Sequence, residues 1–150
     1  MEVLGIDPSL VCTGFAILGA DSLVTLTAET SPKSDLEERL MEIRQRLVSL
    51  ISAYPAIGMV AIEQPIAYRS GVTTINLGML HGVLRVTAYD LGLFIVTVNL
   101  ATVKKRATGN GKASKEEMVE AAKLKWGLDL TSDEADAAFI ALCGREMIEE

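Results

Sequence analysis

The chain has 150 residues, a hydrophobic fraction of 49% and a formal net charge of −6. This length fits one domain over residues 1–150, and the hydrophobic content excludes a disordered chain. No apolar run approaches the roughly 20 residues of a membrane helix, no secretory leader precedes the first apolar segment, and the only cysteines are Cys12 and Cys143. We therefore expect a cytoplasmic protein with reduced thiols.

Three short apolar segments at the start of the chain predict three neighbouring strands. They span residues 3–7, 14–18 and 23–28. Their connections consist of turn-forming residues and are too short for a parallel crossover, so the three strands are expected to be antiparallel. The first strand ends in Asp7.

A helix over residues 35–53 follows, because leucine and isoleucine recur there at helical spacing. Pro55 breaks this helix, and a strand over residues 59–63 ends in Glu63. Continuous aliphatic runs of this kind are typical of parallel strands buried on both faces. A carboxylate is expected at the carboxyl end of such a strand, which is where open α/β sheets place their ligands.

A second long helix is predicted over residues 72–91, and it contains Gly78 and Gly82 four residues apart. Glycine costs a helix about 1 kcal/mol relative to alanine. The pair therefore indicates the close approach of another backbone, either that of the sheet or that of a second subunit. His81, next to Gly82, is expected at the surface or an interface and not as a ligand. A strand over residues 93–98 follows.

The segment 101–125 is basic although the whole chain is acidic. It carries seven basic and three acidic residues, a local charge of +4. A loop is expected over residues 108–111 and a helix over residues 114–125, where Ser114 and Glu117 form a capping box. The basic residues are Lys104, Lys105, Arg106, Lys112, Lys115, Lys123 and Lys125.

The last helix, capped by Thr131 and Glu134, carries Asp133 and Asp136 three residues apart and hence on one face. A single carboxylate in such a position is most often a cap or turn residue, but Asp7, Glu63 and this pair together can meet at one spot. Carboxylates without histidine or cysteine neighbours select Mg²⁺ or Mn²⁺ over zinc. Two such ions about 3.5–4 Å apart can act on the attacking water and the leaving oxygen of a phosphodiester.

The order of elements predicts a mixed five-stranded sheet with helices on both faces, the outline of the ribonuclease H fold. The chain resembles the RuvC family of Holliday junction resolvases in several motifs that occur in the family's order and spacing. These are Leu4-Gly5-Ile6-Asp7-Pro8 with Thr13-Gly14, Ala61-Ile62-Glu63-Gln64, Leu77-Gly78 with Gly82-Val83, Val103-Lys104 with Gly109-Asn110-Gly111 and Lys115, and Asp133 through Asp136-Ala137-Ala138.

The resemblance implies a nuclease that makes paired nicks in a four-way DNA junction as a homodimer. It implies that Asp7, Glu63, Asp133 and Asp136 are catalytic acids that bind two Mg²⁺ ions, for which Mn²⁺ can substitute. Lys104 and Lys115 correspond to basic residues near the scissile phosphate, and Lys115 is counted with the catalytic residues. Further DNA contacts are expected from Lys105, Arg106, Lys112 and Tyr68.

The chain departs from the family pattern at two positions. Ser9 stands where the family has a glycine, and Ile66 stands where members often place an aromatic that stacks on unpaired bases. Tyr68 is the nearest aromatic to that position. The acidic pI of about 4.9 and the lack of a basic C-terminal tail are similar to phage-encoded members.

Three other functions are compatible with parts of this pattern. One is a RuvC-like nuclease for RNA of the YqgF type, which the Asp133/Asp136 helix and the two lysines fit less well. Another is an actin-like or sugar-kinase ATPase, which shares the Gly5-Ile6-Asp7 opening but needs two lobes and more than twice this length. The third is a catalytically inactive binding module, which nothing favours while all four acids are present.

Overall fold

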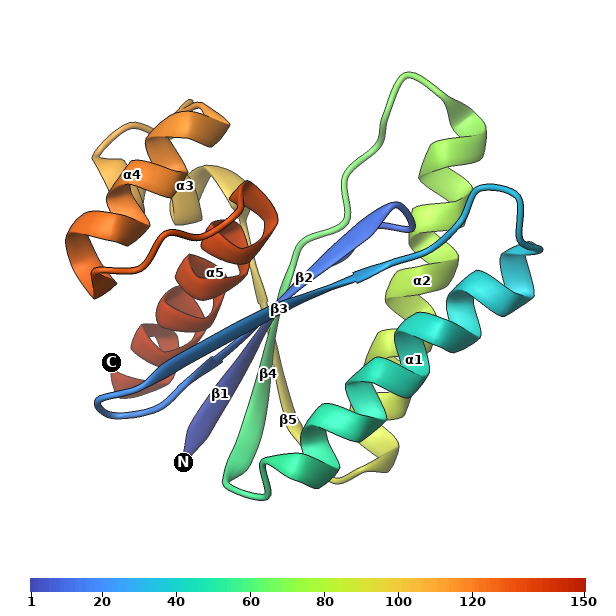
Figure 1. Ribbon diagram of the computed structural model, residues 1–150, viewed down its shortest axis with the longest axis horizontal. Coiled ribbons are helices and arrows are strands. Elements are labelled where there is room, and N and C mark those ends of the chain that lie inside the picture. Colours follow the sequence, from blue (N-terminus) through green and yellow to red (C-terminus); the bar gives the residue numbers. More distant parts are fainter.

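The computed structural model describes residues 1–150 and contains a mixed five-stranded sheet. The strands are β1 (Glu2–Asp7), β2 (Cys12–Leu18), β3 (Leu23–Glu29), β4 (Ile57–Glu63) and β5 (Phe94–Val98). Their order across the sheet is β3-β2-β1-β4-β5, with β1, β2 and β3 antiparallel to one another and β4 and β5 parallel to β1 (Figure 1). The predicted meander and the predicted mixed sheet are confirmed.

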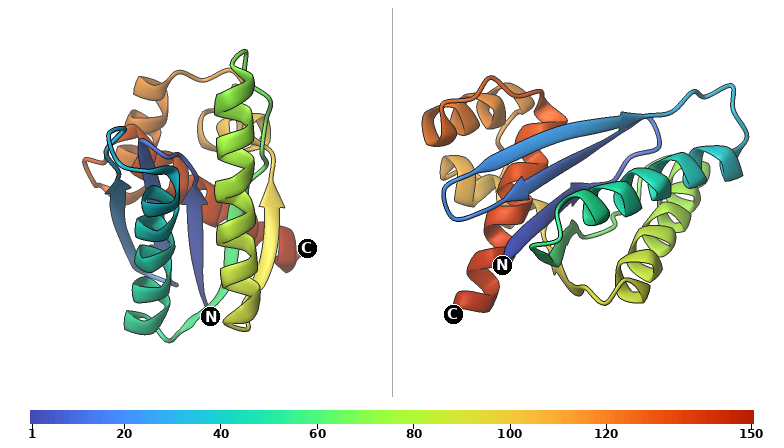
Figure 2. Two further views of the ribbon diagram at one scale, coloured as in Figure 1. Left: turned by 90° about the vertical axis from the view of Figure 1, so that its right-hand side faces the viewer. Right: turned by 60° about the horizontal axis from the view of Figure 1, so that its bottom comes forward.

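Helices cover both faces of this sheet, as predicted. They are α1 (Leu36–Ala53), α2 (Gly71–Asp90), α3 (Leu100–Thr108), α4 (Lys115–Trp126) and α5 (Ser132–Glu149). Helices α1 and α2 lie on one side of the sheet, and α5 lies on the other with α3 and α4 beside it (Figures 1 and 2). No helix is both long enough and apolar enough to cross a bilayer.

The alternation of side chains along the strands divides the core into two layers. Leu4 and Ile6 of β1 pack with buried residues of α1 and α2. Val3 of β1 and the β4 residues Met59 and Ala61 pack with α5 instead. Because side chains alternate along a strand, Asp7, four positions after Val3, and Glu63, two positions after Ala61, belong to the α5 face.

Helix α5 approaches the sheet so closely that only glycine fits at two strand positions. A Cβ atom on Gly5 would collide with the carbonyl oxygen of Ala137, and one on Gly14 would collide with the carbonyl oxygen of Asp133. Gly14 pairs directly with Asp7 in the sheet. This packing therefore brings the first turn of α5 to the edge where β1 ends.

Three sequence expectations need correction. Helix α3 was not predicted, because its basic surface leaves Val103 as its only buried residue; Asn99 caps it by accepting hydrogen bonds from the backbone N–H groups of Ala101 and Thr102. His81 is buried, with 4% of its surface exposed, and does not lie at the surface. No atom lies within 4 Å of a Cβ built on Gly78 or Gly82, so the sheet is not the backbone that approaches them.

Candidate active site

Asp7 and Glu63 lie side by side at the carboxyl ends of two parallel strands. Ile6 of β1 pairs with Ile62 of β4, and each acid is the next residue of its strand. Burial, a hydrogen bond to the Glu63 carboxyl group and repulsion by Glu63, Asp136 and Asp133 raise the pKa of Asp7 well above its usual value. Asp7 thus interacts with each of the other three carboxylates.

Asp136 contributes a buried oxygen atom that has no partner in the protein. Its Oδ1 is fully covered and makes no hydrogen bond. Burial and the charges of Glu63 and Asp133 raise the pKa of Asp136 to about 6, whereas Lys104 and Lys115 act in the opposite direction. A buried, unpaired carboxylate oxygen is costly, and a bound cation would provide the partner that it lacks.

The charge of Asp7 interacts with those of the other three carboxylates. No three of the four carboxylates, however, lie close enough together to ligate a single ion in the positions seen here. Without a cation they repel one another, and ligation by three of them requires side-chain rotation. The donor set consists of carboxylate oxygens alone, which suits a hard divalent cation. The residues therefore fit a magnesium or manganese site in chemistry and in location.

Two lysines on separate helices lie near enough to Asp136 to lower its pKa. Lys104 lies on α3, and Lys115 is the first residue of α4. Both charges act on Asp136, as its pKa shows. The end of the sheet where the acids meet is thereby flanked by positive charge, which suits a phosphate group.

Tyr68, in the connection from β4 to α2, also lies near the acids. Burial and then the charges of Glu63 and Asp7 raise the pKa of its phenol. Its backbone N–H donates to Thr74 Oγ1 at 2.8 Å, which ties this connection to α2. The structure therefore places Tyr68 between the carboxylates and the start of α2.

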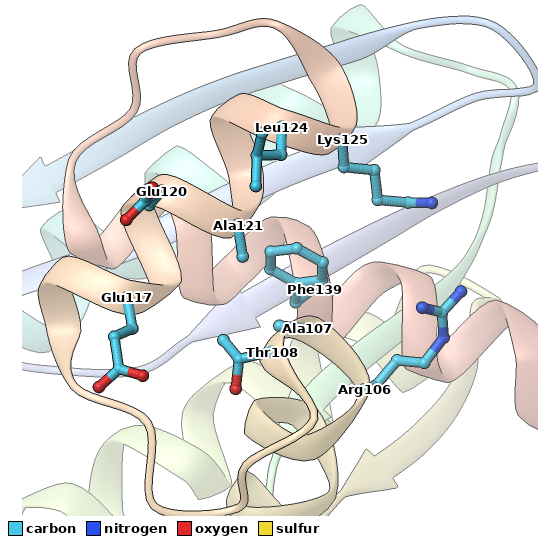
Figure 3. A pocket seen from close by; sticks show the side chains of 9 residues that line it. All are labelled: Arg106, Ala107, Thr108, Glu117, Glu120, Ala121, Leu124, Lys125 and Phe139. Carbon is cyan, nitrogen blue, oxygen red and sulfur yellow. The ribbon is translucent and has the colours of Figure 1, made fainter.

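The remaining predicted DNA contacts are not gathered at the acids. Lys105 and Lys112 are exposed on the surface, while Arg106 is bound to Glu146 by hydrogen bonds of 2.7–3.1 Å. Arg106 lines a cavity of about 510 Å³ between α3, α4 and α5, where Figure 3 shows it opposite Glu117 and beside Phe139. None of the four carboxylates lines that cavity, so Arg106 is turned away from them.

Sequence reasoning missed two interactions that hold the acids in place. Thr13 Oγ1 donates to the carbonyl oxygen of Ser9 at 2.5 Å and accepts from the backbone N–H of Ser9 at 3.1 Å, which closes the turn after Asp7. Glu134 caps α5 as predicted, but its Oε2 also accepts a hydrogen bond of 2.7 Å from Thr25 Oγ1 on β3. The sequence gave a local signal for the first interaction only, in the Thr13-Gly14 motif.

The family model described as crossover junction endodeoxyribonuclease RuvC matches residues 3–144. The chain belongs to the RuvC family. RuvC of Dehalococcoides mccartyi is 31% identical over 151 residues, covering 95% of this chain and 91% of that protein. RuvC of Rhodopirellula baltica is 36% identical over 151 residues, covering 95% and 84%.

A solved structure of Thermus thermophilus RuvC in complex with a Holliday junction substrate has a TM-score of 0.80 to this chain, at 29% identity, and covers 95% of this chain and 91% of that chain. The predicted ribonuclease H-like fold is thereby confirmed. Membership of the RuvC family makes the chain a nuclease, and it implies dependence on a divalent metal ion.

Proposed function

We propose that this RuvC-family chain resolves four-way DNA junctions, and other branched DNA where it fits, by metal-dependent hydrolysis of a phosphodiester. The observation that carries the proposal is the meeting of Asp7, Glu63, Asp133 and Asp136 at one end of the sheet, with the unpaired Oδ1 of Asp136 among them. Two Mg²⁺ ions, or Mn²⁺ in their place, would be held there. The match over nearly the whole chain does not favour the RNA nuclease or the ATPase.

The proposed mechanism divides the work between the acids and the lysines. Divalent ions held by these acids would lower the pKa of a coordinated water and offset charge on the leaving oxygen. Asp7 interacts with all three other acids, which supports its role as the ligand that would be shared by the bound ions. Lys104 and Lys115 hold positive charge beside Asp136, where it stabilises the charge that develops on the phosphate in the transition state.

We further propose that the chain acts as a homodimer through α2, so that two sites make the paired nicks. Positions 72, 75, 79, 82, 86 and 89 of α2 are separated alternately by three and four residues, the spacing of a coiled-coil seam. Apart from Gly82 they are large hydrophobic residues, and these are 47% to 78% exposed. A second copy of α2 would cover this stripe and approach the open backbone at Gly78 and Gly82.

The proposal also includes a single nuclease domain and a cytoplasmic location. Every strand belongs to one sheet, and α3 and α4 pack on α5, which itself packs on that sheet; this supports a single nuclease domain over residues 1–150. A cytoplasmic location fits an enzyme whose substrate is DNA and whose two cysteines are both unpaired.

The test is cleavage of a synthetic four-way junction by Asp7→Asn and Glu63→Gln. Each substitution removes a carboxylate charge with little change in size, so we expect cleavage in Mg²⁺ to fall by at least about a hundredfold. Binding of the junction in Ca²⁺, measured by gel shift, should persist. Three-way, flap and linear DNA and an RNA duplex establish the range of substrates.

Asp129→Asn is the matched control, because Asp129 is an exposed acid paired with Lys123 and lies outside the cluster. It should cut at the wild-type rate. Cleavage near that rate by either Asp7→Asn or Glu63→Gln would remove the assigned site, and a wild-type protein that cuts the RNA duplex but no junction would contradict the proposed substrate.

A further inference from the structure

The cavity between α3, α4 and α5, here called the helix groove, has no role in the proposed chemistry. Its volume of about 510 Å³ lies within the roughly 300–1,000 Å³ that is usual for ligand sites. None of the four carboxylates lines it, so it is separate from the nuclease site. The lining residues that matter for its chemistry are Arg106, Glu117, Glu120, Leu124, Lys125 and Phe139 (Figure 3).

The middle of the helix groove is apolar. Phe139 lies at its base with only 2% of its surface exposed, and Ala107 and Ala121 lie beside it (Figure 3). Leu124 lines the groove with 83% of its surface exposed, the largest fraction of any large hydrophobic residue in the chain. A single exposed leucine is ordinary, but here it continues an apolar lining that the chain itself leaves uncovered. The groove therefore offers a place to bury a large apolar side chain of a partner.

Charged groups of opposite sign flank this apolar region. Figure 3 shows Glu117 and Glu120 on one side of it and Arg106 and Lys125 on the other. Arg106 is bound to Glu146, whereas Glu117, Glu120 and Lys125 take part in no ion pair within the protein. The groove thus has an acidic side and a basic side, and charges on both sides are free to meet a partner.

This distribution of charge favours a protein over DNA as the occupant. Glu117 and Glu120 are three residues apart on one face of α4 and would both repel the phosphates of a nucleic acid. An apolar centre within a rim of both charge signs is typical of protein interfaces. The lining residues Glu117, Glu120 and Leu124 follow α4 at helical spacing, so the groove extends along that helix. A groove of this form suits a second helix laid into it.

We infer that the helix groove docks a helical segment of another protein, one that presents a large apolar side chain between a basic and an acidic residue. The apolar side chain is buried against Leu124 and Phe139. The basic residue lies opposite Glu117 and Glu120, and the acidic residue lies opposite Lys125 and Arg106. This interaction goes beyond the nuclease function and does not depend on it, because the groove contains none of the catalytic acids.

The test uses a synthetic helical peptide of about 15 residues. It is based on alanine and carries a central phenylalanine, a lysine one turn before it and a glutamate one turn after it. We expect saturable binding by isothermal titration calorimetry. The peptide contains no tryptophan, so Trp126, the only tryptophan of the chain, reports docking by fluorescence, because its ring centroid lies 4.8 Å from that of Phe139.

Two matched peptides test the chemistry of the occupant. Alanine in place of the phenylalanine removes the apolar anchor and should weaken binding by about tenfold or more. Glutamate in place of the lysine puts a negative charge opposite Glu117 and Glu120 and should weaken binding by about fivefold.

Variants of the protein test the location of the site. Leu124→Ala should weaken the first peptide by about tenfold, and Glu120→Lys should weaken it by about fivefold. Glu116→Lys is the matched control, because it makes the same charge change on an exposed residue of α4 that does not line the groove, and binding should change by less than about twofold. Leu124→Ala should still cut a four-way junction at the wild-type rate. Circular dichroism verifies that each variant is folded.

Several results would overturn the inference while the nuclease assignment stands. These are no binding of the first peptide, equal binding of all the peptides, or equal losses in Glu116→Lys and Glu120→Lys. Displacement of the peptide by a short DNA duplex would make the groove part of the DNA interface instead. Self-association beyond a dimer that Leu124→Ala abolishes would make a second copy of the chain the occupant. Both of these outcomes contradict a separate protein partner.

Discussion

His81 is a buried titratable residue of α2 to which the proposed chemistry gives no role. Only 4% of its surface is exposed, and its Nδ1 has no hydrogen-bond partner. Burial, followed by the nearby charge of Arg85, lowers its pKa to about 4. The folded protein therefore keeps His81 neutral at pH values at which an unfolded histidine is already protonated.

This difference predicts a loss of stability in acid. In the unfolded chain His81 takes up a proton near pH 6.5, whereas the folded chain resists it down to about pH 4. The unfolded state therefore binds more protons than the folded state between pH 6.5 and 4. The contribution of neutral His81 to stability is present above pH 6.5 and is lost as the pH falls toward 4. The melting temperature of wild type should therefore fall more between pH 7 and 4.5 than that of His81→Leu. Equal slopes for the two proteins would show that His81 does not titrate in this way.

The start of α5 brings Asp133 and Asp136 to the site, and Glu134 anchors the first turn of this helix at two points. Its Oε1 accepts from the backbone N–H of Thr131, and its Oε2 accepts from the hydroxyl of Thr25 on β3. Burial opposes ionisation of Glu134, yet the hydrogen bonds from Thr25 and Thr131 lower its pKa below the usual value. An ionised Glu134 thus connects the start of α5 to the edge strand β3.

Removing this anchor should loosen the metal site without removing a ligand. We expect Glu134→Ala and Thr25→Val to raise the Mg²⁺ concentration for half-maximal cleavage by about fivefold, the equivalent of one lost hydrogen bond of about 1 kcal/mol. Calorimetric titration of the free protein with Mn²⁺ should show a matching loss of affinity.

Glu117→Ala provides the control for that experiment, because it removes the same capping residue from α4, which carries none of the four carboxylates. Both glutamate variants should lose about 0.5–2 kcal/mol of stability as a capping effect. A Mg²⁺ requirement that changes equally in Glu117→Ala and Glu134→Ala would show that Glu134 acts through general stability alone.

For the molecule as a whole, the exposed stripe of α2 and the distribution of charge both support a dimer that forms through α2 and binds DNA with its basic helices. The chain is acidic overall, while positive charge is concentrated on residues 101–125, of which Lys104 and Lys115 act on the carboxylate of Asp136. Helix α2, which carries the apolar stripe, lies on the opposite side of the sheet from α3 and α4 (Figure 2). Dimerisation through α2 would therefore leave the basic helices free to contact DNA.

Gly82→Leu separates the effects on the helix and on the proposed interface. Within one subunit the new side chain meets no atom within 4 Å of its Cβ, and leucine favours a helix over glycine by about 0.8 kcal/mol. The monomer should therefore unfold at a higher temperature, while light scattering should show that the dimer has dissociated. Ser52→Leu, an exposed position of α1, should leave the dimer intact. A stable dimer of Gly82→Leu would place the interface elsewhere.

Local signals in the sequence were sufficient for most of the fold. The aliphatic runs ending in Asp7 and Glu63 predicted two parallel strands, because a continuous aliphatic run indicates a strand that is buried on both faces. The capping boxes at Ser114 and Thr131 located the starts of α4 and α5, because these caps depend on residues three positions apart. The meeting of Asp7 and Glu63 was likewise predictable, since the carboxyl ends of parallel strands share one edge.

Contacts between residues far apart in the chain were decided by packing alone. Helix α3 packs on the core through Val103, its only buried residue, and three of its nine residues are charged. The Thr25–Glu134 hydrogen bond joins residues 109 positions apart, and the helix groove combines residues of α3, α4 and α5. No periodicity encodes such contacts, because they depend on how closely α5 and α2 approach the sheet, and that distance is set by side-chain volumes across the whole core.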